Sequence, residues 1–136
     1  MTEGIVRAMP IRASAANTKG KLETVRSYLE SYLIFSKMLD MRSCEEKEVS
    51  GKEADTRRAA IAYEIVCIKA RMREIEDFIE NLSTTTRWSE CKIFLRYHYV
   101  LGFTVEECSE KMYVSRSTAY RLKKQALRIA SEQLCS

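Results

Sequence analysis

The sequence predicts an all-α protein, and three observations support this. The chain of 136 residues contains only four Gly and one Pro, whereas many-stranded sandwiches and barrels draw heavily on both for their turns. Apolar residues recur every three or four positions over long stretches, which is the period of an amphipathic helix. Short polar segments separate these stretches. We therefore expect an antiparallel, coiled-coil-like helical hairpin followed by a group of short helices.

Composition also excludes several classes of function. No apolar run approaches the roughly 20 residues that cross a bilayer, and no apolar segment of a signal peptide is present. We therefore expect a cytoplasmic protein with no membrane partner. The five cysteines are odd in number and never form a C-x-x-C pair. With a single histidine, His98, and no Gly-rich phosphate loop, we expect no catalytic residue, metal or cofactor, and hence no enzyme.

The first long helix is predicted from Lys21 to about Asp40. Residues 1–20 before it show no apolar period and are expected to form a mobile arm without an assigned role. The stretch 41–53 is rich in Glu and Lys and contains Gly51, so we expect the helix to end there in a turn. The apolar stripe of the helix consists of Leu22, Val25, Leu29, Tyr32 and Leu39.

The most regular pattern lies between Ile61 and Leu82, where apolar residues alternate steps of four and three over three heptads. This seam can pack against the helix at 21–40 or against a second copy of itself. We favour the hairpin within one chain as the primary contact, with a homodimer through or beside the Ile61–Leu82 helix as a further contact. Residues 21–82 are thus expected to be an interaction domain. The seam consists of Ile61, Ile65, Ile68, Met72, Ile75, Ile79 and Leu82.

A C-terminal domain is predicted over residues 83–136, with a core of its own. Four hydroxyl residues at 83–86 precede it, and such residues are good helix N-caps and poor helix interiors. A first helix is predicted from Trp88 to Val100, with an end at Gly102. Its buried face consists of Cys91, Phe94, Leu95 and Tyr99.

A second short helix is predicted to begin at Thr104, where Thr104 and Glu107 form the pattern of a capping box. Its buried residues are Val105, Cys108 and Met112, and the small Ser109 permits a close helix crossing. A turn at Tyr113 and Val114 follows.

A third helix, capped by Ser115, has one apolar and one basic side. Its expected buried residues are Ala119, Leu122, Ala126 and Leu127. Two short helices, a tight turn and a following helix with basic exposed positions form the pattern of a helix-turn-helix. The exposed set is Arg116, Ser117, Tyr120, Arg121, Lys124 and Arg128.

Charge indicates the partner of this surface. Residues 21–82 carry 11 basic and 13 acidic side chains, whereas residues 83–136 carry nine basic and five acidic ones. The stretch 115–128 has five basic residues and no acidic one. We therefore predict double-stranded DNA as the partner. The first four exposed residues would reach base edges, while Lys124 and Arg128 would reach phosphates, and the helix N-terminus at Ser115 suits a phosphate.

The run from Leu101 to Arg128 resembles region four of bacterial sigma factors. The matching segments are Gly102-Phe103-Thr104-Val105-Glu106-Glu107, Val114-Ser115-Arg116 and Ala126-Leu127-Arg128. The resemblance implies that Arg116, Ser117, Tyr120 and Arg121 contact bases. At the last three of these positions the family usually has Glu, Arg and Gln, so its usual promoter element is not carried over to this chain.

The rest of the chain contains no segment that resembles the sigma region that melts promoters. In its small size and in the helical hairpin before this module, the chain is similar to phage and prophage transcriptional regulators of the RinA and ArpU type. The resemblance implies a sequence-specific regulator, an activator of phage or prophage genes that works with host RNA polymerase. Two alternatives remain open: a protein-interaction adaptor that binds polymerase or acts like an anti-sigma factor, and a phage DNA-packaging subunit that recognises DNA.

Overall fold

The computed structural model describes residues 18–51 and 54–135. Within these ranges every regular element is helical and no strand occurs, which confirms the all-α prediction. None of the described helices is long and apolar enough to span a membrane. Most of the expected arm, residues 1–17, lies outside the described residues, and the remainder, 18–20, already belongs to the first helix.

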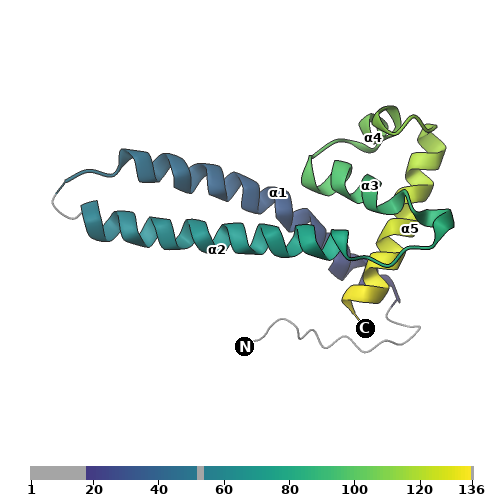
Figure 1. The fold of residues 1–136 in the computed structure, drawn as a ribbon, viewed down its shortest axis with the longest axis horizontal. Coiled ribbons are helices and arrows are strands. Elements are labelled where there is room, and N and C mark those ends of the chain that lie inside the picture. The colour runs from purple at the N-terminus through teal and green to yellow at the C-terminus, as the bar shows by residue number, and fades with distance from the viewer. Residues whose placement is uncertain (1–17, 52–53, 136) are drawn as a thin grey trace.

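Two long helices, α1 (Thr18–Glu48) and α2 (Ala54–Glu80), lie side by side and run in opposite directions (Figure 1). The α2 seam packs against α1, and Ile75 and Ile79 are fully buried. The hydroxyl of Tyr32 on α1 donates a hydrogen bond to Glu76 on α2. Because the seam is covered within one chain, the dimer contact expected through the Ile61–Leu82 seam has no free surface there. Here "tip" means the described residues between 36 and 70, and "base" means the other described residues.

The first helix extends farther than the sequence pattern predicted. It continues to Glu48 instead of ending near Asp40. Arg42 bonds Glu45 on the same helix at 3.0 Å and reaches Glu64 on α2 at 3.3 Å. Glu, Lys and Arg are good helix formers, and paired at this spacing they stabilise a helix. Residues 41–48 of the charged run are therefore helical, and the turn expected within 41–53 begins only after Glu48, with Gly51 at a φ of 108°.

Five short elements follow α2. They are the 3₁₀ helix η2 (Thr86–Trp88), α3 (Cys91–Leu95), the π-helical segment η3 (Arg96–Val100), α4 (Val105–Lys111) and α5 (Arg116–Leu134). The single helix predicted over 88–100 is thus divided into three segments. Its predicted buried face is confirmed, because Cys91, Phe94, Leu95 and Tyr99 are all buried.

One apolar core joins the base of the long helices to the C-terminal segments. The C-terminal part of α5 crosses α1 (Figure 1), and Gly102 lies against Leu33 of α1. The core of the C-terminal segments is therefore continuous with that of the long helices and does not stop at residue 83. The core residues with 0% exposure are Val25, Leu29, Ile79, Cys91, Phe94, Leu95, Cys108, Ala119, Ala126 and Ala130.

Candidate nucleic-acid interface

The start of α4 is fixed by a capping box, as predicted. The Glu107 amide donates to the Thr104 hydroxyl at 3.1 Å, and the Thr104 amide donates to the Glu107 carboxylate at 2.9 Å. Val105 and Cys108 on the same helix are buried, while Met112 is only partly buried. The two bonds satisfy amides that would otherwise lack partners, so the orientation of α4 is set from its first turn.

The turn between α4 and α5 has an uncommon backbone. Tyr113 has a φ of 58°, in the left-handed region, which costs a non-glycine residue roughly 1–2 kcal/mol. The Val114 amide donates to the Ser109 carbonyl at 3.0 Å and closes the turn. Ser109 is buried, as its small size predicted. The Tyr113 side chain is 95% exposed, so packing does not explain the choice of a large aromatic residue.

The first turn of α5 is capped by Ser115. Its hydroxyl accepts a hydrogen bond from the Thr118 amide at 3.1 Å and donates one to the Thr118 hydroxyl at 2.9 Å. The cap oxygen is thus engaged within the helix. The amides of Arg116 and Ser117 precede the first intrahelical bond, and they are the groups at this terminus that can receive an anion.

The two sides of α5 have opposite character. Ala119, Leu122 and Ala126 are at most 3% exposed, whereas Leu127 is only partly buried. All the residues expected to face a partner are exposed: Ser115, Arg116, Ser117, Tyr120, Arg121, Lys124 and Arg128. We call these seven residues the basic face. Their side chains lie away from the core, so they can contact a partner without any change in the fold.

One side chain of the basic face is held by α4. The Tyr120 hydroxyl donates to the Glu106 carboxylate at 2.6 Å. This hydrogen bond raises the pKa of Tyr120 and lowers the pKa of Glu106, and the nearby Arg116 and Lys123 charges lower that of Glu106 further. Glu106 therefore stays ionised and fixes the Tyr120 ring at the crossing of α4 and α5.

Sequence reasoning missed two contributors beside the basic face. Lys123 is partly buried, and its charge acts on Glu106 and on His98. Its spacing of seven from Arg116 places both on one side of the helix, which was the available signal. Lys111 at the end of α4 lies 5.2 Å from the centre of the Phe103 ring. Lys123 thus adds a positive charge beside the basic face, and Lys111 adds one at the end of α4.

The titratable groups in the nearby core have structural contacts. His98 Nδ1 lies 2.7 Å from the Phe103 carbonyl oxygen, and burial lowers the His98 pKa. Burial raises the pKa of the Cys91 and Cys108 thiols to about 11, so both are protonated and unreactive at neutral pH. Among the described residues, no three His, Cys, Asp or Glu side chains gather as metal ligands would.

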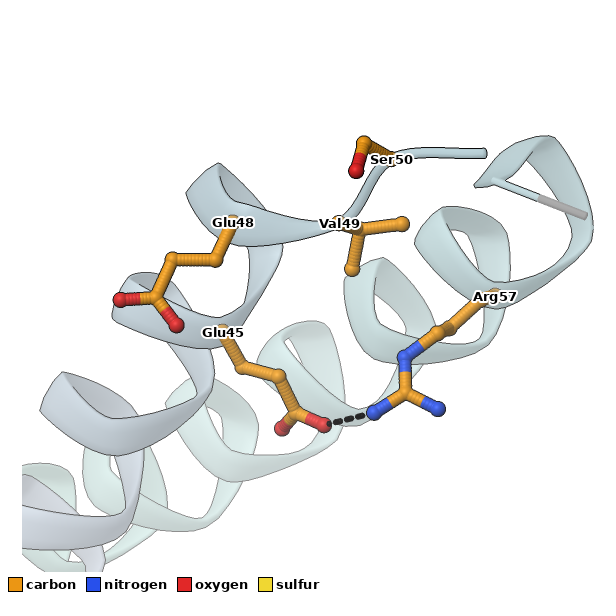
Figure 2. A pocket seen from close by; sticks show the side chains of 5 residues that line it. All are labelled: Glu45, Glu48, Val49, Ser50 and Arg57. Atoms are coloured by element: carbon orange, nitrogen blue, oxygen red, sulfur yellow. Dashed lines mark hydrogen bonds and ion pairs between the residues drawn. The ribbon is translucent and has the colours of Figure 1, made fainter. Parts of the chain in front are cut away.

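A hollow of about 390 Å³ lies in the tip (Figure 2). The tip is at the opposite end of the long helices from α5 (Figure 1). Its lining includes Val49, Ser50 and the Glu48 carboxylate. The Arg57 guanidinium is already bonded to Glu45 at 2.8 Å (Figure 2). The hollow is open and lies between exposed helix ends, so it does not extend the basic face.

Comparison of the chain with protein-family models, with curated proteins and with solved structures finds no match.

Proposed function

We propose that the chain is a sequence-specific DNA-binding transcriptional regulator that inserts the N-terminal half of α5 into the major groove. The observation that carries this proposal is the basic face itself. Its four cationic and three hydroxyl-bearing side chains stand on one exposed side of a helix whose other side is buried, with no acidic residue between 115 and 128. A positively charged helix side of this kind suits the phosphate-lined groove of a duplex.

The proposed contacts fall into two groups. Arg116, Ser117, Tyr120 and Arg121 are assigned to base edges, because a recognition helix enters the groove by its N-terminal half. Lys124 and Arg128 lie one to two turns farther along and are assigned to phosphates. The amides at the N-terminus of α5 would receive a further phosphate.

The more specific proposal is activation of phage or prophage genes together with host RNA polymerase. The resemblance of residues 101–128 to sigma region four supports it. In this proposal the basic face binds DNA, while the long helices contact polymerase or a second subunit. Promoter opening would then depend on the holoenzyme.

Two substitutions test the DNA contacts. The preferred site is first obtained by footprinting the protein on genomic DNA. Arg121→Ala should weaken binding to that site far more than to random DNA, because an Arg paired with a base contributes roughly 1–3 kcal/mol of discrimination. Lys124→Ala should weaken both about equally and reduce the salt slope by about one unit. Lys47→Ala removes the same charge from the tip and is the matched control.

The outcomes separate this proposal from its alternatives. If Arg121→Ala weakens both sequences equally, Arg121 is a phosphate contact. In vitro transcription from the occupied promoter, with purified holoenzyme, then tests activation. Occupancy without a change in transcript favours the packaging subunit. No site-specific occupancy at all, with a flat salt dependence, rejects DNA recognition and favours the protein-interaction adaptor.

A further inference from the structure

The helix α2 has a second apolar seam, on the side that faces away from α1. Ala59, Tyr63, Val66 and Ala70 follow steps of four, three and four, which places them on one helix face. Tyr63 is 71% exposed and Val66 is 64% exposed, and both alanines are exposed as well. We call these four residues the outer seam. It occupies the same stretch of helix as the first three isoleucines of the buried seam.

The outer seam is unusual for a solvated helix face because it has almost no charge around it. Between residues 59 and 70 the only charged side chains are Glu64 and Lys69. Glu64 is turned toward α1, where it lies 3.3 Å from Arg42. A helix face that only meets water normally has charged residues. An exposed, uncharged stripe with a regular period instead indicates a surface that another helix covers.

We propose that the occupant is α2 of a second copy of this chain, packed antiparallel about a two-fold axis between Tyr63 and Val66. A two-fold interface must be complementary to itself. The outer seam meets this condition, because its order is small, large, large, small. In the antiparallel arrangement Tyr63 packs beside Val66 of the second copy, and the two alanines meet at each end and allow close approach.

Charges at the two ends of the seam select the same orientation. Asp55 lies four residues before Ala59, and Arg73 lies three residues after Ala70. Both side chains are exposed, and Asp55 also lies 3.6 Å from Arg58 on its own helix. An antiparallel pair brings Asp55 of each copy near Arg73 of the other, whereas a parallel pair would bring like charges together. The charge pattern therefore favours the antiparallel dimer.

The length of the seam sets the expected strength of the dimer. Eleven residues of helix between Ala59 and Ala70 span about 16 Å. One helix face of that length buries less than the roughly 800 Å² per partner of a standard interface. We therefore expect a dimer that dissociates on dilution, and not an obligate one.

A matched pair of substitutions tests which surface is used. Sedimentation velocity of the full chain over a wide concentration range should show a monomer–dimer equilibrium. Val66→Glu should shift the midpoint at least tenfold toward monomer. Met41→Glu is the control, because Met41 is 63% exposed on the outer side of α1. Circular dichroism confirms that both variants remain folded. A wild-type protein that stays monomeric at every concentration overturns the proposal, as does a dimer lost only in Met41→Glu.

Crosslinking tests the orientation. Two proteins are prepared in a background with the exposed Cys44 and Cys67 and the partly exposed Cys135 changed to Ser, one with Ala59→Cys and the other with Ala70→Cys. A short bis-maleimide should link the two proteins when they are mixed and should link neither efficiently to itself. Efficient linking of each protein to itself would indicate a parallel pair and overturn the proposal. Neither experiment uses DNA, so failure here is distinguishable from failure of the proposed DNA binding.

Discussion

The tip and the base of the molecule are stabilised in different ways. At the base, α1, α2, α3 and α5 surround large side chains that are removed from solvent, among them Leu29 and Phe94 at 0% exposure. In the described part of the tip, α1 meets only α2. There Ile61 and Ile65 retain 4% and 9% exposure, and ion pairs such as Arg57–Glu45 connect the helices.

This difference indicates which part determines stability and which part presents surface. Exposed ion pairs contribute about 0–1 kcal/mol each, whereas complete burial of a large apolar side chain contributes roughly 1.5–3 kcal/mol. The free energy of unfolding therefore depends mainly on the base. The tip keeps its shape with few buried side chains, and its outer surfaces, including the outer seam, are free to meet other molecules.

The largest expected effect comes from placing a charge in the base part of the buried Ile61–Leu82 seam. The same change in its tip part is the comparison. Ile75→Asp puts a carboxylate where exposure is 1%, and an unpaired buried charge costs several kcal/mol. We expect loss of cooperative folding, measured by thermal unfolding with circular dichroism. Ile61→Asp, in the tip, should be tolerated with a smaller loss, because this part of the helix pair can open locally while the base remains folded.

Amide hydrogen exchange of the two variants shows which parts of the chain unfold in each. In Ile61→Asp, protection should be lost in the tip and kept in α3 and α5. Equal loss of protection at both ends would show that the long helices and the base unfold as one unit, and the distinction drawn between tip and base would be wrong.

Much of the fold could be predicted from the sequence. Where one helix face packs against one other helix, the residues that recur with the helical period are also the ones that are buried. The seam between Ile61 and Leu82 is such a case. The helical period did not predict the segments whose backbone departs from the α-helix. At η3 the Leu101 amide bonds the Arg96 carbonyl, five residues back, at 2.9 Å, and this wider turn has no sequence signal. The shared core was missed because helical spacing shows a buried face without showing what covers it.

Part of the candidate site could likewise be predicted from the sequence, and part could not. Helical spacing alone predicted which residues of α5 are exposed, because Ala119 and Leu122 fix the buried side. The Tyr120–Glu106 hydrogen bond could not be predicted, since it joins side chains on two helices and depends on their crossing. The positive φ of Tyr113 was not predictable from the residue type, because Gly, Asn or Asp is usual at a turn position of this kind.

Two residues with positive φ give the next largest effects, and of opposite sign. Gly102 has a φ of 80° and lies against α1 in the base, so Gly102→Ala should lower the free energy of unfolding by roughly 1–2 kcal/mol. Tyr113 is in the exposed turn, and Tyr113→Gly should leave stability unchanged or raise it by up to about 1 kcal/mol. Chemical denaturation measures both.

DNA titration of Tyr113→Gly then separates stability from function. If the exposed tyrosine contacts the duplex, the variant should bind more weakly although it is at least as stable as the wild type. A variant that is destabilised would instead show that the Tyr113 side chain supports the turn, and the difference between the two positive-φ sites would disappear.

The smallest effect concerns pH and tests how firmly the base is closed. His98 is the only histidine, and burial lowers its pKa below the usual 6.5 despite the hydrogen bond to the Phe103 carbonyl. The unfolded chain therefore takes up the proton first as pH falls. The stability that His98 contributes is present above about pH 6.5 and is lost as pH falls toward the folded pKa, with a slope of at most about 1.4 kcal/mol per pH unit. Melting temperatures of the wild type should fall between pH 7.5 and 5.5, and His98→Gln should flatten this dependence. If the wild type melts at the same temperature at both values, His98 is reached by solvent and protonated in the folded state, and the base is more open than its buried side chains indicate.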